Sequence, residues 1–315
     1  MNTISNLAIK QLKNNKISLF KDNKKVGYVT YDINSFNASI YINIYNVNNY
    51  QKNLLIKLVL RHLFISFNLN NITFDNKVVT SSEFFFLNKY DVLLFDIDDT
   101  LLSFSKTERM ALTKALNKVN VKADEKIIET YHKINIACWE EVEKNIISRQ
   151  ECLTKRFDIF LPLYNIDFPS KDFEDLYRSN LDNYAYLVKD AKYVLNHLKE
   201  NFAIYAITNG VKLTQVKRVR KAKLNKYFIK SFISEEIGYN KPSIYFFKAV
   251  KDYIKDLSLS KTLIIGDSLT SDIKLGHNNN VDTCWFNLYY QENTKQIIPT
   301  YQINELKELL LHYKN

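Results

Sequence analysis

The order of hydrophobic and polar positions divides the chain into two segments with different patterns. In residues 1–88, short β-prone stretches surround one stretch, Tyr50–Phe67, whose apolar residues recur at three- and four-residue spacing. That spacing predicts an amphipathic helix, and the flanking stretches predict strands. The predicted strands are Ile17–Phe20, Val26–Tyr31, Ala38–Tyr45, Ile72–Phe74 and Lys77–Thr80. The first segment, residues 1–88, is therefore expected to form a small α+β domain.

From residue 89 to residue 315 the pattern is that of an α/β domain. Short, fully apolar runs predict the buried strands of a parallel sheet: Val92–Phe95, Phe202–Ile207 and Thr262–Ile265. About a hundred residues separate the first two runs, whereas a crossover between parallel strands needs only about a dozen. The excess predicts an all-helical cap inserted at about residues 104–185. Its four predicted helices are Glu108–Val121, Asp124–Lys144, Arg149–Leu163 and Lys171–Asn183.

The first apolar run ends in three carboxylates and a hydroxyl, within residues 96–100. In open α/β sheets, ligands bind just outside the carboxyl ends of the strands. Asp96 and Asp98 are two residues apart, so on an extended chain their side chains point the same way. Carboxylates crowded together repel each other unless a cation offsets their charge, and a hard cation such as Mg²⁺ suits oxygen ligands. The alternative is an ordinary acidic turn after a strand.

Three further polar sites lie downstream, each near the end of a predicted strand. Thr208–Gly210 offers a hydroxyl and an amide that can donate hydrogen bonds to a phosphoryl oxygen. Lys241 precedes Pro242, which is expected in the first turn of a helix. Asp267 ends the third apolar run, and Asp272 falls in the opening turn of the next predicted helix, where the helix dipole favours a carboxylate. Each site alone is also common in proteins without catalytic function.

Together, the four sites resemble the motifs of the haloacid dehalogenase (HAD) superfamily of phosphotransferases. The patterns are Asp-x-Asp-x-Thr, Thr-Asn, Lys-Pro and Gly-Asp-x₄-Asp, in this order along the chain. The resemblance covers residues from about 90 to the end. It implies a Rossmannoid core with a helical cap, and a Mg²⁺-dependent phosphomonoester hydrolase that forms an aspartyl-phosphate.

The resemblance also implies a role for each motif residue. Asp96 would be the nucleophile, and Asp98 the general acid and base. The implied phosphate-binding residues are Thr208, Asn209 and Lys241, of which Thr208 and Lys241 also count as catalytic. The implied magnesium ligands are Asp96, Asp98 through its backbone carbonyl, Asp267 and Asp272.

A narrower resemblance points to the substrate class. Ala206–Gly210, Phe232–Gly238 and Asp282–Asn287 resemble the YjjG/YfnB branch of pyrimidine 5'-nucleotidases. This implies a 5'-nucleotidase for pyrimidine, including non-canonical, nucleoside monophosphates. The implied substrate contacts in the cap are Asn135, Trp139 and Arg156, although a buried aromatic ring is more often part of a core. Two alternatives remain: a HAD phosphatase for sugar phosphates or other small phosphoesters, and a bifunctional or regulatory protein whose first segment binds a partner or ligand.

The first segment carries a second, fainter resemblance. Its order of strands and helix is similar to part of a GNAT-type acetyltransferase. That family places a glycine-rich turn for the coenzyme pyrophosphate where this chain has Gln51–Ile56, which contains no glycine. No acetyl-transfer activity is therefore expected.

Composition and charge restrict the remaining function classes. A chain of 315 residues with 46% hydrophobic and 25% charged residues is globular. The net charge is +10, but the lysines are scattered along the chain, which does not favour a nucleic-acid partner. Three cysteines without metal-type spacing, and an N-terminus without a signal-peptide pattern, predict a cytoplasmic protein. No apolar run approaches the ~20 residues that span a bilayer, so no membrane partner is expected. The expected partner is a small phosphomonoester.

Overall fold

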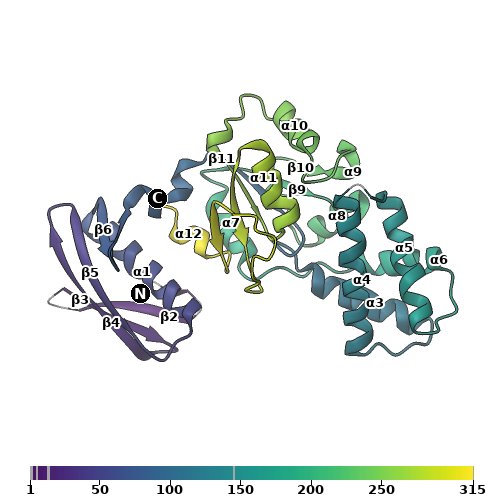
Figure 1. Ribbon diagram of the computed structural model, residues 1–315, viewed down its shortest axis with the longest axis horizontal. Helices are drawn as coiled ribbons and strands as arrows, with labels where there is room; N and C mark the ends of the chain where they lie inside the picture. Colours follow the sequence, from purple (N-terminus) through teal and green to yellow (C-terminus); the bar gives the residue numbers. More distant parts are fainter. Residues whose placement is uncertain (1–2, 5, 13–14, 145, 315) are drawn as a thin grey trace. The chain divides into compact units, whose positions relative to one another are not determined.

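The computed structural model describes residues 3–4, 6–12, 15–144 and 146–314, and the chain forms two compact units (Figure 1). The first unit comprises Met1–Lys89 together with Lys307–Asn315, and the second comprises Tyr90–Leu306. The division differs at the C-terminus from the expected 89–315 domain, because the last residues of the chain belong to the first unit.

The described part of the first unit forms a seven-stranded sheet whose strands neighbour one another in sequence order. All pairs are antiparallel except β5 with β6, which are parallel and are connected through helix α1 (Asn49–Phe67). The first two strands were not predicted from the sequence. The strands are β1 (Thr3–Ile4), β2 (Leu7–Leu12), β3 (Lys16–Lys21), β4 (Lys24–Asn34), β5 (Asn37–Ile44), β6 (Asn71–Phe74) and β7 (Lys77–Thr80).

Helix α1 explains why the C-terminal segment belongs to this unit. Its Lys57 Nζ lies 2.6 Å from Glu308 Oε2, in the short helix α12 (Glu308–Leu311). Arg61 of the same helix donates hydrogen bonds of 2.7 Å to the backbone oxygens of Leu311 and Tyr313. Leu311 is buried in the hydrophobic core of the first unit. These contacts are tertiary, so the local pattern of residues 307–315 did not reveal them. Two further short helices complete the unit: α2 (Ser81–Phe84) and a 3-10 helix (Phe86–Lys89).

The second unit is built on a parallel sheet, as the sequence predicts. Its described residues form six strands in the order β10-β9-β8-β11-β12-β13, all parallel. The first strand in sequence, β8, therefore lies in the middle, and the chain order reverses there. In such sheets this reversal opens a crevice at the carboxyl ends of the strands. The strands are β8 (Val92–Asp96), β9 (Ala203–Thr208), β10 (Ser231–Ile233), β11 (Thr262–Gly266), β12 (Asp282–Phe286) and β13 (Tyr301–Ile303).

Helices connect these strands. One connection differs from the prediction: α10 begins at Ile244 with Ser243 as its N-cap, so Pro242 lies before the helix and not in its first turn. The Ser243 hydroxyl accepts a hydrogen bond from the Tyr245 backbone N–H, which satisfies one of the free donors at the start of the helix. The helical segments of the core are α7 (Ala191–Leu198), α8 (Lys212–Lys221), α9 (Ser234–Ile237), α10 (Ile244–Tyr253), a 3-10 helix (Leu259–Lys261), a π-helical turn (Leu269–Ile273) and α11 (Lys274–Asn279).

The insertion between β8 and β9 is a helical cap, as the sequence predicts (Figure 1). Four helices share an aromatic core in which the buried rings of Tyr131, Phe157 and Tyr177 contact one another. None of the helices that the structure describes is long and apolar enough to cross a membrane. The cap helices are α3 (Phe104–Lys118), α4 (Glu125–Glu143), α5 (Arg149–Leu163) and α6 (Ser170–Leu181).

Candidate active site

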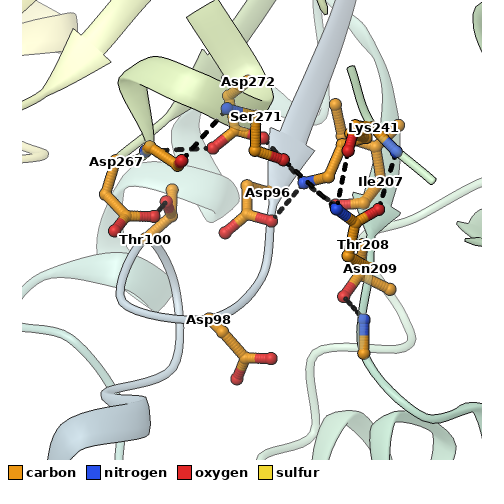
Figure 2. Close-up of polar contacts among 12 residues, drawn as sticks. Asp96, Asp98, Thr100, Ile207, Thr208, Asn209, Lys241, Asp267, Ser271 and Asp272 are labelled. Atoms are coloured by element: carbon orange, nitrogen blue, oxygen red, sulfur yellow. Dashed lines mark hydrogen bonds and ion pairs between the residues drawn. The ribbon is translucent and has the colours of Figure 1, made fainter. Parts of the chain in front are cut away.

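Three carboxylates from two neighbouring strands meet at the centre of the sheet edge (Figure 2). Asp96 is the last residue of β8, and Asp267 directly follows β11, the strand paired with β8. Asp272 lies in the π-helical turn that follows β11. Each residue offers one carboxylate oxygen, and these oxygens lie within 4.8 Å of one another. The parallel register of the two strands thus brings together residues that are far apart in sequence.

Lys241 lies against this acidic cluster with its side chain almost completely buried. Its Nζ is 2.6 Å from Asp96 Oδ1 and 2.6 Å from Asp272 Oδ1, and it donates a third hydrogen bond of 3.2 Å to the Ile207 carbonyl. All three donors of the ammonium group are used. Lys241 therefore sits where it can offset negative charge on Asp96 and on any anion bound next to it.

Asn209 positions Lys241. Its side-chain oxygen accepts a 2.8 Å hydrogen bond from the Lys241 N–H, and its side-chain nitrogen donates a 2.9 Å bond to the Lys241 carbonyl. The same nitrogen lies 3.3 Å from Ser271 Oγ. The sequence predicts Asn209 as a phosphate-binding residue. The structure instead directs its amide to the backbone of Lys241 and to Ser271, because the two turns carrying these residues lie next to each other.

The cluster carries more negative than positive charge. Burial, opposed by Lys241 and reinforced by the Asp272 carboxylate, raises the pKa of Asp96 to about 8. Burial and the charges of Asp96 and Asp272 raise the pKa of Asp267 well above its usual range. Three carboxylates facing one ammonium group fit a divalent cation, which would remove the repulsion and the cost of burial.

A glycine makes room for this arrangement. A Cβ atom at Gly266 would lie 2.2 Å from Asp272 Oδ2, which is too close for any side chain. Asp272 itself is held by Lys241 on one oxygen and by the Ser268 N–H, at 3.2 Å, on the other. The Gly-Asp-x₄-Asp pattern therefore packs its second aspartate against its glycine.

The loop after β8 holds the other motif residues. Thr100 donates a 3.2 Å hydrogen bond to Asp267 Oδ1, and Asp99, in left-handed backbone conformation with φ 54°, accepts a 3.3 Å bond from the Ser105 N–H. The side chain of Asp98 points away from the acidic cluster (Figure 2). It is bound by Arg218 and Gln215, both from α8. The Asp98 carboxylate is thus not part of the acidic cluster, and the predicted contact to a metal was through its backbone carbonyl.

Thr208 completes the set of predicted core residues. It ends β9, the other neighbour of β8, and its hydroxyl accepts a 3.0 Å hydrogen bond from the Gly210 N–H. Thr208 lines the same cavity as the three carboxylates and Lys241. The hydroxyl proton has no acceptor among these contacts, so it is available to an oxygen of a bound anion.

The cavity has a volume of about 830 Å³ and is lined by both the sheet edge and the cap. Small-molecule sites in proteins range over roughly 300–1,000 Å³. From the cap, the half-buried Trp139 and the predicted contacts Asn135 and Arg156 line it, together with Glu108 and His132. The cavity therefore has room for a substrate larger than a phosphate ion.

Two of the predicted cap contacts are already engaged with other residues. Arg156 donates a 2.7 Å bond to Asn135 Oδ1 and pairs with Glu174 Oε2 at 2.6 Å, and its guanidinium lies over the rings of Phe157 and Tyr177. Asn135 in turn donates a 2.7 Å bond to Glu108. The structure thus assigns Arg156 and Asn135 to a buried polar network within the cap. Of the three predicted substrate residues, Trp139 has the most exposed side chain in the cavity wall.

Sequence reasoning missed the two α8 residues that hold Asp98. Thr214, Gln215 and Arg218 are buried, although the inward face of a helix is usually apolar. Polar residues at three- and four-residue spacing, directly after a strand-end motif, were the available signal. Because α8 has few apolar residues, its hydrophobic periodicity does not indicate which face is buried.

The fold and the site together define a class. The features are those of a HAD-type hydrolase. The strand order of the central parallel sheet reverses at its first strand, which ends in an aspartate. A lysine and two further carboxylates lie next to this aspartate, and a helical cap covers them. Residues 90–279 match the family model described as haloacid dehalogenase-like hydrolase. The chain belongs to this family of hydrolases.

Curated relatives and solved structures are similar to the same part of the chain. The putative HAD-hydrolase YfnB of Bacillus subtilis is 37% identical over 71% of this chain and 95% of its own length. The pyrimidine 5'-nucleotidase PynA of Streptococcus pneumoniae is 35% identical over 70% of this chain and 94% of its length. The pyrimidine 5'-nucleotidase YjjG of Escherichia coli is 29% identical over 70% and 96%. The crystal structure of Bacillus subtilis YfnB bound to magnesium has 38% identity and a TM-score of 0.67, covering 70% of this chain and 97% of that one.

Proposed function

We propose that the protein is a Mg²⁺-dependent phosphomonoester hydrolase that acts as a 5'-nucleotidase on pyrimidine nucleoside monophosphates, non-canonical ones included. One observation carries the proposal: Asp96, Asp267 and Asp272 converge within 4.8 Å, next to Lys241, at the floor of a capped cavity. This arrangement suits the binding of a phosphate dianion and of a divalent cation that offsets the crowded carboxylates.

Asp96 attacks the phosphorus of the bound ester, forming an aspartyl-phosphate while the bond from phosphorus to the ester oxygen breaks. Asp98, protonated at this stage, gives its proton to the departing alkoxide. In the second step the Asp98 carboxylate takes a proton from a water molecule, whose oxygen attacks phosphorus and releases Asp96 and inorganic phosphate. Asp98 thus loses one proton in the first step and regains one in the second, so it ends the cycle in its starting state.

The remaining residues supply charge and position. Asp96, Asp267 and Asp272 would hold Mg²⁺, together with the Asp98 backbone carbonyl. When bound, the ion screens the approach of one anion to another. Lys241 offsets charge on the transferring group, Thr208 donates its hydroxyl to a phosphoryl oxygen, and Asn209 fixes the backbone of Lys241.

The nucleotide assignment rests on the relatives and on the cavity. Two relatives that align along almost their whole length, PynA and YjjG, are pyrimidine 5'-nucleotidases. The cavity of about 830 Å³ has space for a nucleoside beside the phosphate position, and Trp139 in its wall offers an aromatic face for a base.

A substrate panel tests the proposal. The purified full-length protein is assayed with pyrimidine and purine nucleoside monophosphates, with sugar phosphates and with p-nitrophenyl phosphate, in Mg²⁺ and in EDTA. We expect Mg²⁺-dependent release of phosphate, with the highest kcat/KM for pyrimidine nucleotides. Preference for a sugar phosphate would overturn the substrate assignment, and full activity in EDTA would overturn the metal-dependent mechanism.

A further inference from the structure

The side chain of Asp98 is held by two residues of helix α8. Arg218 Nη1 lies 2.5 Å from Asp98 Oδ1, and Gln215 Nε2 donates a hydrogen bond to Asp98 Oδ2. Gln215 and Arg218 are three residues apart, so they lie on the same face of the helix. Both carboxylate oxygens of Asp98 are therefore oriented by one rigid element of the core, although Asp98 itself lies in a loop.

Arg218 is buried in a way that structural packing does not explain. Its side chain is 1% exposed, and its guanidinium lies 5.4 Å from the centre of the Phe104 ring in the first turn of the cap. Its Nε and Nη2 atoms are buried without a hydrogen-bond partner among the described residues. Burying unpaired N–H groups of a charged side chain costs free energy, so the residue is expected to have a function that offsets the cost.

Arg156 is a buried arginine whose guanidinium has several hydrogen-bond partners, as expected for a structural role. It is equally buried, but its guanidinium contacts Asn135 and Glu174, and its Nε lies 3.4 Å from a backbone carbonyl. Arg218 has one carboxylate partner, and that partner is the proposed acid and base. Its hydrogen bond goes to Asp98, and its side chain lines the cavity.

Gln215 occupies space that a glycine leaves open. A Cβ atom at Gly210 would lie 2.1 Å from Gln215 Nε2 and 2.8 Å from its Cδ. The glycine of the Thr208–Gly210 turn therefore permits the contact between Gln215 and Asp98. A methyl group at position 210 would displace the end of a flexible side chain and would not clash with backbone.

We infer that Arg218 is a positioning residue for Asp98, because it fixes Oδ1 so that Oδ2 faces the oxygen of the leaving group. Gln215 holds Oδ2 until substrate takes its place. The inference rests on the proposed function. Arg218 makes a charge-assisted contact from a buried, stacked position, so it stays in place when substrate binds. Gln215 is neutral and makes a single contact to Asp98, so the ester oxygen can take its place. With Gln215 displaced, Oδ2 takes up one proton from solvent, and Asp98 transfers this proton to the ester oxygen as the bond from phosphorus to that oxygen breaks.

The test compares two esters that differ in their need for an acid. Uridine 5'-monophosphate releases an alkoxide, which departs only with a proton, whereas p-nitrophenyl phosphate releases a stable phenolate. The ratio kcat/KM reports the steps up to the first irreversible one, which is the departure of the leaving group. We expect Arg218→Met to lower kcat/KM for uridine 5'-monophosphate about 10²-fold, and that for p-nitrophenyl phosphate only about twofold.

Matched variants make the test specific. Arg218→Lys keeps the charge but not the planar fork, and we expect a smaller loss than for Arg218→Met. Gly210→Ala displaces Gln215 and should change kcat/KM for either ester by no more than about twofold, because the hydrogen bond that it disturbs is the one that substrate replaces. Arg220→Met, at an exposed position of the same helix, should leave both esters unaffected. Thermal unfolding of each variant shows whether the fold is intact.

The outcomes separate this inference from the proposed function. Equal losses on both esters for Arg218→Met, or no loss on either, would overturn the positioning role while the hydrolase assignment stands. A wild-type protein that cleaves neither ester in Mg²⁺ would overturn the proposed function and this inference with it. A selective loss that follows the need for a proton supports the inference.

Discussion

Two clusters of buried charged residues in the second unit differ in their charge balance. In the cap, Arg156 pairs with Glu174 and bonds Asn135, and Glu108 accepts hydrogen bonds from Asn135 and lies 2.5 Å from His132 Nδ1. At the sheet edge, three carboxylates face the single ammonium group of Lys241.

We infer from this difference that the sheet-edge cluster is the active site and that the cap cluster stabilises the fold of the cap. In the cap, positive and negative groups match and the hydrogen-bonding atoms serve one another, so the cluster needs nothing from solution. At the sheet edge three carboxylates face one ammonium group and the pKa of Asp96 is raised to about 8, so a bound cation would complete the cluster. Both clusters contain buried charged groups, so burial alone does not distinguish them. They differ because only the sheet-edge cluster has carboxylates in excess of cationic groups.

Substitution of the nucleophile should have the largest effect on activity. Asp96→Asn keeps the size of the side chain but removes the attacking oxyanion, so we expect kcat to fall by more than about 10³-fold. Steady-state phosphate release in Mg²⁺ measures this, with circular dichroism as the control for folding. Substantial residual turnover by a folded Asp96→Asn protein would assign the attack to another group.

Substitution in the balanced cluster should instead affect stability. Arg156→Met leaves the buried Glu174 carboxylate with only its 3.4 Å pair to Arg178, and we expect a loss of about 3 kcal/mol in the free energy of unfolding. Urea denaturation measures it. Arg109→Met, which breaks an exposed pair with Glu125 in the same cap, is the matched control and should leave the free energy of unfolding nearly unchanged. A stable Arg156→Met protein that no longer discriminates among nucleotides would instead show that Arg156 contacts substrate.

The excess charge at the sheet edge also predicts a dependence of stability on pH. The pKa of Asp96, at about 8, is raised above the ordinary value near 4, so the folded state retains a proton that the unfolded state releases. That contribution to stability is complete below about pH 4 and is lost as the pH rises through about 8. In EDTA, Tm should therefore fall between about pH 5 and pH 9, and Mg²⁺ should raise Tm more at the upper end.

Differential scanning calorimetry measures both trends. Asp267→Asn, which removes one predicted ligand, is the comparison and should respond less to Mg²⁺. A Tm that responds to Mg²⁺ equally at both pH values would contradict the idea that the cation replaces repelled charge in this cluster.

The smallest expected effect concerns the wall of the cavity. Trp139→Ala removes the aromatic face proposed to contact a base, so KM for pyrimidine nucleotides should rise about tenfold, while p-nitrophenyl phosphate is cleaved as before. Initial-rate kinetics on both esters give the comparison. If the preference among nucleotides and sugar phosphates does not change, Trp139 is a core residue of the cap.

The residues at the sheet edge could be predicted from the sequence, because each of them lies at or shortly after the end of a recognisable strand. Asp96 and Asp267 each lie at the end of an apolar run, and the carboxyl ends of parallel strands gather at one edge, so the sequence predicts their proximity. The helical insertion was equally visible, since four amphipathic stretches lie between two strands that a short crossover could connect.

Tertiary contacts could not be predicted in this way. Nothing local in residues 307–315 indicates that they pack with Lys57 and Arg61, about 250 positions earlier in the chain. The sequence predicts phosphate binding for Asn209 but not the contact that its side chain makes with the backbone of Lys241, which depends on the proximity of two turns. The partners of Asp98 lie on helix α8. The buried face of this helix is mostly polar, so hydrophobic periodicity does not identify it.

The most direct test of the central claim is to trap the phosphorylated protein. Asp98→Asn should still transfer the phosphoryl group of p-nitrophenyl phosphate, which needs no acid, but it lacks the base that activates water for the second step. Acid quenching followed by peptide mass spectrometry should then find one phosphoryl group on the peptide that contains Asp96, in Mg²⁺ but not in EDTA, and none in the Asp96→Asn/Asp98→Asn double variant. A phosphoryl group on any other residue, or p-nitrophenol released in a burst without modification of Asp96, would contradict the account.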